Sequence, residues 1–401
     1  MPSERRRARP RFGVSPSSAW TRYGAAAMNL LGARRYTREA LGIQDVPRGA
    51  VVVHFAATPA EIYQLEQWAE LLHTVDQERP VRIVVNRPDV GRLVSQRTGL
   101  PVVFAPSASQ LEELVSQRPP AVILYVNHRE PNFRLLRHAH IPHVYIGHGE
   151  SDKGASASHQ NLAYDYAFVA GQAGRDRLAA AMPFFDVSVR APMVGRPMAG
   201  SGRGRVDPSR VLYAPTWEGG LPSMALGSVV SHGVPLVRAL IAGGFSVTYR
   251  PHPLTGTEQS AHREADQAVR TLIAEAGEPH RLDLGPYEQA FDGAALAIVD
   301  VSSVAYDWLA TDRPFLLTVP TNPAARPLPS MLSERAPRLT AAQAEDGPTV
   351  ASRVRSLIAE PPTSMRDVAE YHFGDLEVGA STRRFLAALA EVIETWERRQ
   401  G

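Results

Sequence analysis

Hydrophobic residues in the first half of the chain form short continuous runs, separated by stretches of helical periodicity. A short apolar run is typical of a buried strand, whereas apolar residues three and four positions apart indicate an amphipathic helix. The alternation predicts a parallel sheet with helices on both faces. The predicted strands are Val51–Phe55, Val81–Val85, Val102–Phe104, Ala121–Val126, Val144–Ile146 and Tyr166–Val169. The predicted helices are Glu61–His73, Val90–Thr98 and Ser109–Gln117.

The alternation stops at a glycine-rich stretch and then begins again. Residues 199–209 include Gly-Ser-Gly-Arg-Gly and are predicted to be a linker. We therefore expect an α/β protein with two doubly wound, Rossmann-like domains, residues 42–198 and 210–375, facing across a cleft. A C-terminal helix is expected at 376–401. Ligands of such sheets bind beyond the carboxyl ends of the strands. The second set of predicted strands and helices is Val211–Ala214, Val234–Ala242, Ser246–Tyr249, Arg263–Ala276, Arg281–Leu284, Leu296–Val299 and Phe315–Val319.

The N-terminal segment differs from the rest of the chain in its charge. Residues 1–40 hold nine arginines and two glutamates, a net charge of +7, while the remainder carries −5. Residues 1–18, rich in Arg, Pro and Ser, are predicted to be a disordered basic arm. Residues 19–41 have helical periodicity, and this helix either packs on the first domain or lies in a membrane interface. The acidic body argues against nucleic acid as a partner, and the arm favours an anionic membrane surface or polyanion.

Composition excludes several kinds of chemistry. The chain has no cysteine, so disulfides, thiolate catalysis and cysteine–zinc sites are ruled out. An ordinary hydrophobic share of 44% over 401 residues is enough for two or three domains. We expect no apolar run long enough to cross a bilayer.

A histidine between two glycines follows the predicted strand at Val144–Ile146. The sequence His148-Gly149-Glu150 places an imidazole at a strand end, where it suits proton transfer near neutral pH. Lys153 follows closely and is the only lysine in the chain. A turn with a hydrogen-bonded histidine explains the same pattern without a function. His138, His140 and His143 lie upstream, but they lack the spacing of a zinc site, so we expect no metal there.

Three more clusters follow strands of the second half. Thr216 and Trp217 end one predicted strand in Ala-Pro-Thr-Trp, and Arg250 and His252 end the next in Arg-Pro-His-Pro. An arginine and a histidine at one strand end suit a phosphate, while a rigid turn with solvated charges is the structural alternative. Trp217 is equally explained as a packing residue.

The fourth cluster joins a buried strand to a helix. Asp300, Ser302 and Ser303 precede that helix, and Asp307 lies within it. Either serine can cap the helix, whose free backbone N–H groups attract anions. A cap without a ligand is the alternative.

In this order the four clusters resemble the CDP-glycerol glycerophosphotransferase family, the teichoic-acid polymerase type with a GT-B fold. The resemblance covers about residues 120–390. The positions that match are His148, Gly149 and Lys153; Leu212 to Trp217; Arg250, His252 and Pro253; and Asp300, Ser302, Ser303 and Asp307. The chain departs from the pattern at Gly147 and Glu150, and the family's C-terminal Asp-Gly…Arg segment is degenerate, with Val378 in place of the aspartate before Arg383.

The resemblance implies transfer of a polyol phosphate from a CDP-linked donor, most simply CDP-glycerol, to a hydroxyl of a cell-wall or capsular glycopolymer, with release of CMP. It implies His148 as the general base and His252 as the second catalytic histidine. The donor would contact Arg250, Asp300, Ser302, Ser303, Thr216 and Trp217, with Lys153, Glu150, Asp307 and Arg383 in support.

The expected partners are the CDP-alditol donor and a lipid-linked or polymeric acceptor. The expected location is the cytoplasm, with a peripheral position on the inner face of the plasma membrane as a further option. No cofactor is expected to be required, and a need for a divalent cation stays open. Two alternatives are a GT-B glycosyltransferase that uses a nucleotide-sugar and a non-catalytic polyanion-binding protein with the same fold.

Overall fold

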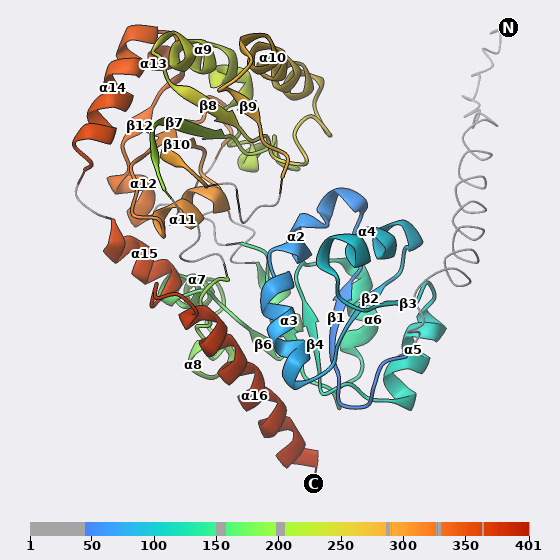
Figure 1. Cartoon of the computed structure of the whole chain (residues 1–401). Helices are drawn as coiled ribbons and strands as arrows, with labels where there is room; N and C mark the ends of the chain where they lie inside the picture. Colours follow the sequence, from blue (N-terminus) through green and yellow to red (C-terminus); the bar gives the residue numbers. More distant parts are fainter. Residues whose placement is uncertain are drawn as a thin grey trace, which may run out of the picture.

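The computed structural model describes residues 45–149, 158–197, 205–285, 289, 291–325, 327, 330–362 and 365–400. The predicted basic arm and N-terminal helix, Glu150, Lys153 and most of the predicted linker lie outside the described residues. The chain forms two α/β domains, drawn one above the other in Figure 1.

The first domain is built on a six-stranded parallel sheet in the order β3-β2-β1-β4-β5-β6. Strand β1 is buried along its whole length because helices cover both faces of the sheet. The change of direction between β1 and β4 is the switch point at which such sheets bind ligands. The strands are β1 (Val51–Phe55), β2 (Val81–Val85), β3 (Val102–Phe104), β4 (Val122–Tyr125), β5 (His143–Tyr145) and β6 (Tyr166–Ala167).

Helices and short 3-10 turns connect these strands. The predicted helix Glu61–His73 is divided at Gln67 and Trp68, whose side chains donate to backbone carbonyls of the loop after β5. The elements are η1 (Pro59–Glu61), α2 (Tyr63–Glu66), α3 (Ala69–Glu78), α4 (Pro88–Thr98), α5 (Ala108–Gln117), η2 (Glu130–Asn132), α6 (Phe133–Leu136), η4 (His159–Ala163), α7 (Gln172–Ala181) and α8 (Val187–Arg190).

The second domain repeats the same topology. Its parallel strands have the order β12-β11-β10-β7-β8-β9, so its switch point lies between β10 and β7. Strand β7 starts at Asp207, so the linker ends earlier than the predicted 209. The strands are β7 (Asp207–Ala214), β8 (Ser246–Tyr249), β9 (Arg281–Leu282), β10 (Ala294–Val299), β11 (Phe315–Thr318) and β12 (Arg338–Leu339). Its helices are η5 (Pro222–Met224), α9 (Val229–Ala242), α10 (Ser260–Ala276), α11 (Ser303–Leu309), α12 (Met331–Arg335), α13 (Ala341–Ala344), α14 (Gly347–Ala359) and α15 (Arg366–Phe373).

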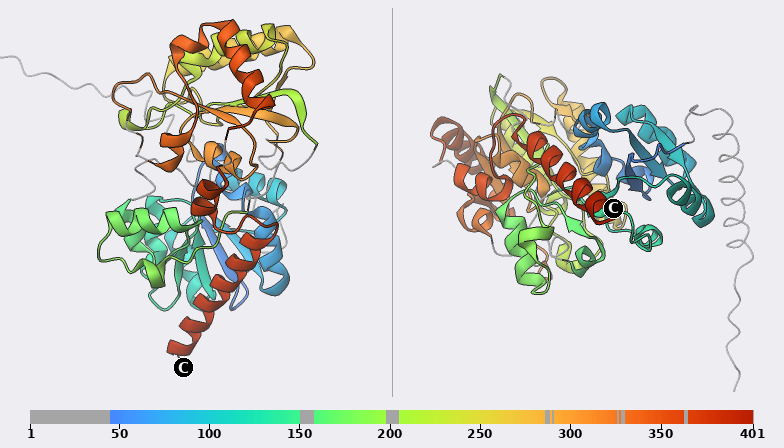
Figure 2. Two further views of the ribbon diagram at one scale, coloured as in Figure 1. Left: turned by 90° about the vertical axis from the view of Figure 1, so that its left-hand side faces the viewer. Right: turned by 90° about the horizontal axis from the view of Figure 1, so that it is seen from below.

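The last helix, α16 (Ala380–Gln400), returns to the first domain. Figures 1 and 2 show α15 and α16 running from the second domain down along the first. Phe385 of α16 packs against Trp68 and Phe168, with ring centroids 5.6 Å apart in both pairs. Leu389 and Val392 join the same core. The C-terminal helix is therefore part of the first domain's core, although it is distant in sequence.

One described stretch, Pro222–Ala242, is long and apolar enough to cross a membrane by length and composition. We expected no such run, so this finding is a correction. Half or more of the stretch is buried, and its helical part, α9, belongs to the core of the second domain. Its apolar character follows from this packing.

Candidate functional site

The three motifs of the second half gather at one edge of the second sheet. Thr216 follows β7, His252 follows β8 and Asp300 follows β10. These strands are neighbours in the order β10-β7-β8, so their carboxyl ends lie side by side. The motif residues therefore meet at the switch point, where ligands of such domains bind.

The first domain has an equivalent edge. The segment Pro59–Trp68 follows β1, Val126 follows β4 and His148 follows β5. Strands β1, β4 and β5 are also neighbours. The two edges face each other, because Tyr63 of the first domain contacts His252 of the second.

Tyr63 connects the two candidate catalytic histidines. Its ring centroid lies 6.4 Å from that of His148 and 5.4 Å from that of His252, and both contacts are edge-to-face. Burial raises the pKa of the Tyr63 phenol, so it stays protonated at neutral pH. Tyr63 was not predicted from the sequence, because a tyrosine inside a helical pattern gives no functional signal.

The ring orientation of His148 is fixed by a backbone carbonyl. Its Nδ1 lies 2.7 Å from the Val126 oxygen. A carbonyl can only accept, so Nδ1 carries the hydrogen and Nε2 becomes the basic nitrogen. The backbone is fixed separately, because the His148 oxygen accepts from Gln67 Nε2 at 2.8 Å and the Gly147 oxygen accepts from Trp68 Nε1 at 2.9 Å.

His252 is held in the opposite tautomer. The Leu254 backbone N–H donates to its Nδ1 at 3.1 Å, so in the neutral ring Nε2 carries the hydrogen. The indole of Trp217 stacks on the imidazole with ring centroids 6.0 Å apart. His252 is thus arranged to donate a hydrogen bond, whereas His148 is arranged to accept a proton.

The carboxylate of Glu218, which was not among the predicted site residues, holds the loop after His252. Glu218 is fully buried and accepts from the backbone N–H groups of Gly256, Glu258 and Gln259 at 2.9 to 3.1 Å. Although burial opposes ionisation, these hydrogen bonds lower the pKa of Glu218 overall. The loop is therefore tied to the residue that follows Trp217.

Asp300 lies beneath the site and not at its surface. Its carboxylate is fully buried and accepts from the backbone N–H groups of Thr216 at 2.7 Å and Ser228 at 3.0 Å, and from the Thr318 hydroxyl. Burial raises the pKa of Asp300. The sequence predicted a donor contact, but this geometry makes Asp300 the residue that positions Thr216.

Arg250 forms an ion pair at the end of β8. Its Nη1 donates to Asp283 at 2.8 Å and its Nη2 donates to the Gly285 oxygen at 3.1 Å. Only 16% of each side chain of the pair is exposed. The guanidinium is therefore fixed in direction before any phosphate arrives.

The two serines differ in their surroundings. Ser302 is buried, and its hydroxyl has no hydrogen-bond partner among the described residues. Ser303, the first residue of α11, lies beside Gly149, where a Cβ would come within 3.0 Å of the Ser303 Cβ. The glycine after His148 thus allows the loop of one domain to approach the other domain closely.

Asp307 pairs with Arg196, a residue that was not predicted from the sequence. Arg196, which precedes the linker, meets it with an Nε–Oδ1 distance of 2.5 Å and an Nη2–Oδ2 distance of 3.0 Å. The two side chains are 5% and 1% exposed. An arginine near a linker carries no sequence signal, because its partner lies more than a hundred residues away.

The other predicted residues lie apart from this centre. Arg383 is exposed on α16 and pairs with Glu377 at 3.0 Å. His143 contacts the Tyr125 hydroxyl at 2.9 Å, and His138 lies 3.4 Å from Glu112. No cluster of three or more metal-ligating side chains occurs among the described residues.

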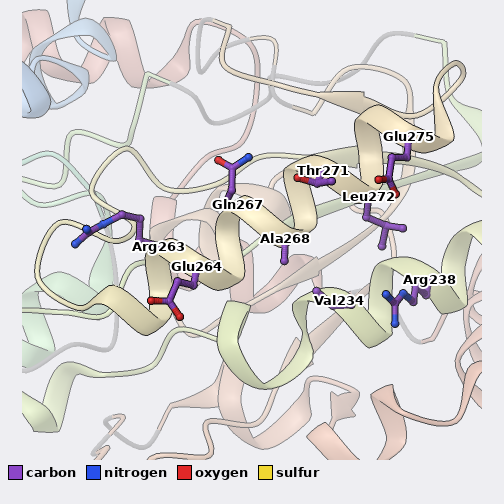
Figure 3. A pocket seen from close by; sticks show the side chains of 9 residues that line it. All are labelled: Val234, Arg238, Arg263, Glu264, Gln267, Ala268, Thr271, Leu272 and Glu275. Carbon is purple, nitrogen blue, oxygen red and sulfur yellow. The ribbon is translucent and has the colours of Figure 1, made fainter.

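A cavity of about 690 Å³ lies between α9 and α10 in the second domain (Figure 3). Its walls include Arg238, Glu264 and Leu272, and none of the candidate site residues lines it. Arg263 at one end donates to the Gly256 oxygen at 3.1 Å and so supports the loop after His252.

Part of the chain matches a known protein family. Residues 201–322 match the model of a family described as CDP-glycerol:poly(glycerophosphate) glycerophosphotransferase. This segment holds the Thr216, His252 and Asp300 motifs, and the family resemblance expected from the sequence is confirmed there. No curated protein sequence matches the chain.

Three solved structures share the fold. A provisionally assigned UDP-N-acetylglucosamine 2-epimerase from Listeria monocytogenes is 13% identical, with 87% of this chain and 97% of that chain covered and a TM-score of 0.57. The wall teichoic acid polymerase TagF is 12% identical, with 95% and 99% covered and a TM-score of 0.54. A glycosyltransferase from Rickettsia africae is 8% identical, with 87% and 99% covered and a TM-score of 0.54. The predicted two-domain α/β fold of the GT-B type is thus confirmed.

Proposed function

We propose that this chain transfers glycerol phosphate, or a related alditol phosphate, from a CDP-linked donor to an acceptor hydroxyl and releases CMP. The observation that carries the proposal is the pair of histidines in opposite tautomers, one from each domain, on either side of Tyr63. The family match over residues 201–322 supports a donor of the CDP-glycerol type in the second domain. One TagF structure was obtained with CDPG, which supports the same choice by analogy of fold.

In the proposed reaction the acceptor oxygen attacks the β-phosphorus of the donor. Its proton passes to Nε2 of His148 as the new O–P bond forms. The bond between the β-phosphorus and the bridging oxygen breaks, and CMP leaves with that oxygen. Positioning and charge stabilisation account for most of the rate in such transfers.

The second domain supplies the stabilising contacts. Nε2–H of His252 donates to a phosphate oxygen, with the ring held against Trp217. Arg250 supplies positive charge from its fixed position at the end of β8, and Ser303 offers a hydroxyl at the start of α11. Asp300 acts indirectly, through the Thr216 loop that it holds.

A second candidate is a GT-B glycosyltransferase that uses a nucleotide-sugar. The observation that favours it is the fold shared with the Rickettsia glycosyltransferase. The acceptor polymer is a proposal from the sequence. Binding of an anionic surface by residues 1–41 is also a proposal from the sequence, because that segment lies outside the described residues.

A nucleotide panel separates the candidates. Ligands that bind the native state raise its apparent stability. We expect CDP, CMP and CDP-glycerol to raise the melting temperature, and UDP and UDP-sugars to raise it less. Equal or larger shifts with uridine nucleotides would favour the glycosyltransferase, and no shift with any nucleotide at millimolar concentration would contradict both enzymes.

A further inference from the structure

We propose that Gln67 is a positioning residue that ties the location of His148 to the contact between the two domains. The inference rests on the proposed role of His148 as the base. Gln67 lies at the break between α2 and α3 and is only 7% exposed. Both polar atoms of its side-chain amide are used: Nε2 donates to the His148 oxygen, and Oε1 accepts from Arg196, which in turn pairs with Asp307 of the second domain.

The side-chain nitrogen of Gln67 holds the loop that carries His148. Gln67 Nε2 donates to the His148 oxygen at 2.8 Å, and the neighbouring Trp68 holds the Gly147 oxygen at 2.9 Å. Because the imidazole is oriented separately by Val126, the Gln67 contact sets where the ring lies, while Val126 sets how it is turned.

The oxygen of the amide reaches the domain boundary. Gln67 Oε1 accepts from Arg196 Nη2 at 2.7 Å, and the same guanidinium forms the two-contact ion pair with Asp307 on α11. The stability of a buried ion pair depends on its geometry, because a buried charge that loses its partner has no water to solvate it. A shift of α11 therefore reaches His148 through two buried side chains.

A second contact follows the same route. Beyond His148 the chain passes so close to α11 that a Cβ at Gly149 would lie 3.0 Å from the Ser303 Cβ and 3.6 Å from Arg196 Nη1. The loop that carries His148 therefore lies against Ser303 and Arg196, two residues at the boundary between the domains. The geometry couples the docking of the domains to the placement of the base.

Gln67→Glu tests the link because it separates the two contacts. A carboxylate still accepts from Arg196, but it has no N–H for the His148 oxygen. We expect Gln67→Glu and Gln67→Ala to lower kcat about 100-fold, since a small misplacement of a catalytic group costs that much. KM for the donor should stay within about 3-fold of the wild-type value, because the donor binds the second domain.

Asp266→Asn is the matched control. Asp266 is buried, forms an ion pair with Arg270 on α10 at 2.7 Å and accepts from the Tyr249 hydroxyl at 2.7 Å, so these contacts lie within the second domain. A loss of kcat in Asp266→Asn equal to that in Gln67→Glu would assign the effect to general loss of stability.

The double variant Gln67→Glu with His148→Ala provides a further test, because the effects of two substitutions that act through the same catalytic group are not additive. The Gln67→Glu effect should disappear from the residual rate of His148→Ala.

A readout without turnover separates this proposal from the proposed reaction. Nitrogen-15 histidine spectra, with the His148 signals assigned from His148→Gln, should show those signals shifted in Gln67→Glu and unshifted in Asp266→Asn. If CMP release is absent from the wild type but the His148 signals shift, the proposed reaction fails and the positioning role stands. Unchanged His148 signals and unchanged kcat in both Gln67 variants would overturn the positioning role.

Discussion

His148 and His252 come from different domains, are held in opposite tautomers and lie against the same side chain. A carbonyl accepts from Nδ1 of His148, a backbone N–H donates to Nδ1 of His252, and the ring of Tyr63 contacts both. One imidazole is therefore prepared to take a proton and the other to give a hydrogen bond. The proposed division of work between the two histidines follows from this relationship.

Replacement of either histidine by alanine should lower the rate of turnover strongly and leave the fold intact. General acid–base groups contribute roughly 10²–10⁴-fold to rate, so we expect losses in that range for His148→Ala and His252→Ala. Both rings are only partly buried, so their removal leaves no large cavity. The measurement is kcat together with circular dichroism. Activity within a few-fold of wild type would remove that histidine from the mechanism.

Tyr63 should act through its ring and not through its hydroxyl. Tyr63→Phe keeps both edge-to-face contacts and should retain kcat within about 3-fold, whereas Tyr63→Ala leaves both imidazoles without their common support. We expect a loss of about 10- to 100-fold in Tyr63→Ala, since placement of catalytic groups controls rate. Steady-state kinetics of both variants provide the test. Equal losses in the two variants would point to a role for the hydroxyl instead.

Much of the fold could be predicted from the local pattern of apolar and polar residues. Continuous apolar runs predicted β1, β2, β3 and β8 with the bounds that the structure shows, because buried parallel strands need such runs. Strand β12 was missed because its two residues, Arg338–Leu339, carry no periodicity. The C-terminal helix was predicted, but its packing on Trp68 depends on contacts between distant parts of the chain.

The site was predictable where chemistry is concentrated in one short segment. His148, His252 and Thr216 stand out because histidine, proline and glycine cluster after apolar runs. Tyr63, Gln67 and Arg196 could not be found this way, because their roles come from partners distant in the sequence. Asp300 shows a further limit: its position after a strand was clear, but not its complete burial.

Because Asp300 is fully buried, its replacement should lower the free energy of unfolding. Asp300→Ala would leave the N–H groups of Thr216 and Ser228 unpaired, and each such buried group costs roughly 1–3 kcal/mol. We expect the free energy of unfolding to fall by about 3 kcal/mol. Asp300→Asn keeps one oxygen for both N–H groups and should cost less than about 1 kcal/mol. Urea unfolding measures both, and similar values for the two variants would contradict this account.

The burial of His372 should make the free energy of unfolding depend on pH. The ring is 2% exposed, packs 4.3 Å from Tyr306, and neither nitrogen has a hydrogen-bond partner among the described residues. Burial, helped by the charge of Arg177, lowers its pKa from 6.5 to about 3. The unfolded state therefore binds more protons below pH 6.5, and the free energy of unfolding falls as the pH decreases from 6.5 toward 3.

His372→Phe should remove this contribution. At pH 7 the variant should be as stable as the wild type or more stable, because two unpaired polar atoms leave the core. Between pH 7 and pH 5 it should lose about 2 kcal/mol less than the wild type, because each pH step of one below the ordinary histidine pKa costs the wild type about 1.4 kcal/mol. Urea unfolding at the two pH values tests this. Identical losses in both proteins would show that His372 is not held neutral.

The most direct test of the central claim is the fate of the phosphorus in CDP-glycerol. With wild-type protein and a hydroxyl-bearing glycerol phosphate acceptor, phosphorus-31 spectra should show loss of the diphosphate, appearance of CMP and formation of a phosphodiester in equal amounts. His148→Ala should form both products at least about 100-fold more slowly while still binding CMP. An intact diphosphate after prolonged incubation with wild-type protein that binds CDP-glycerol, or turnover by His148→Ala at the wild-type rate, would contradict the account.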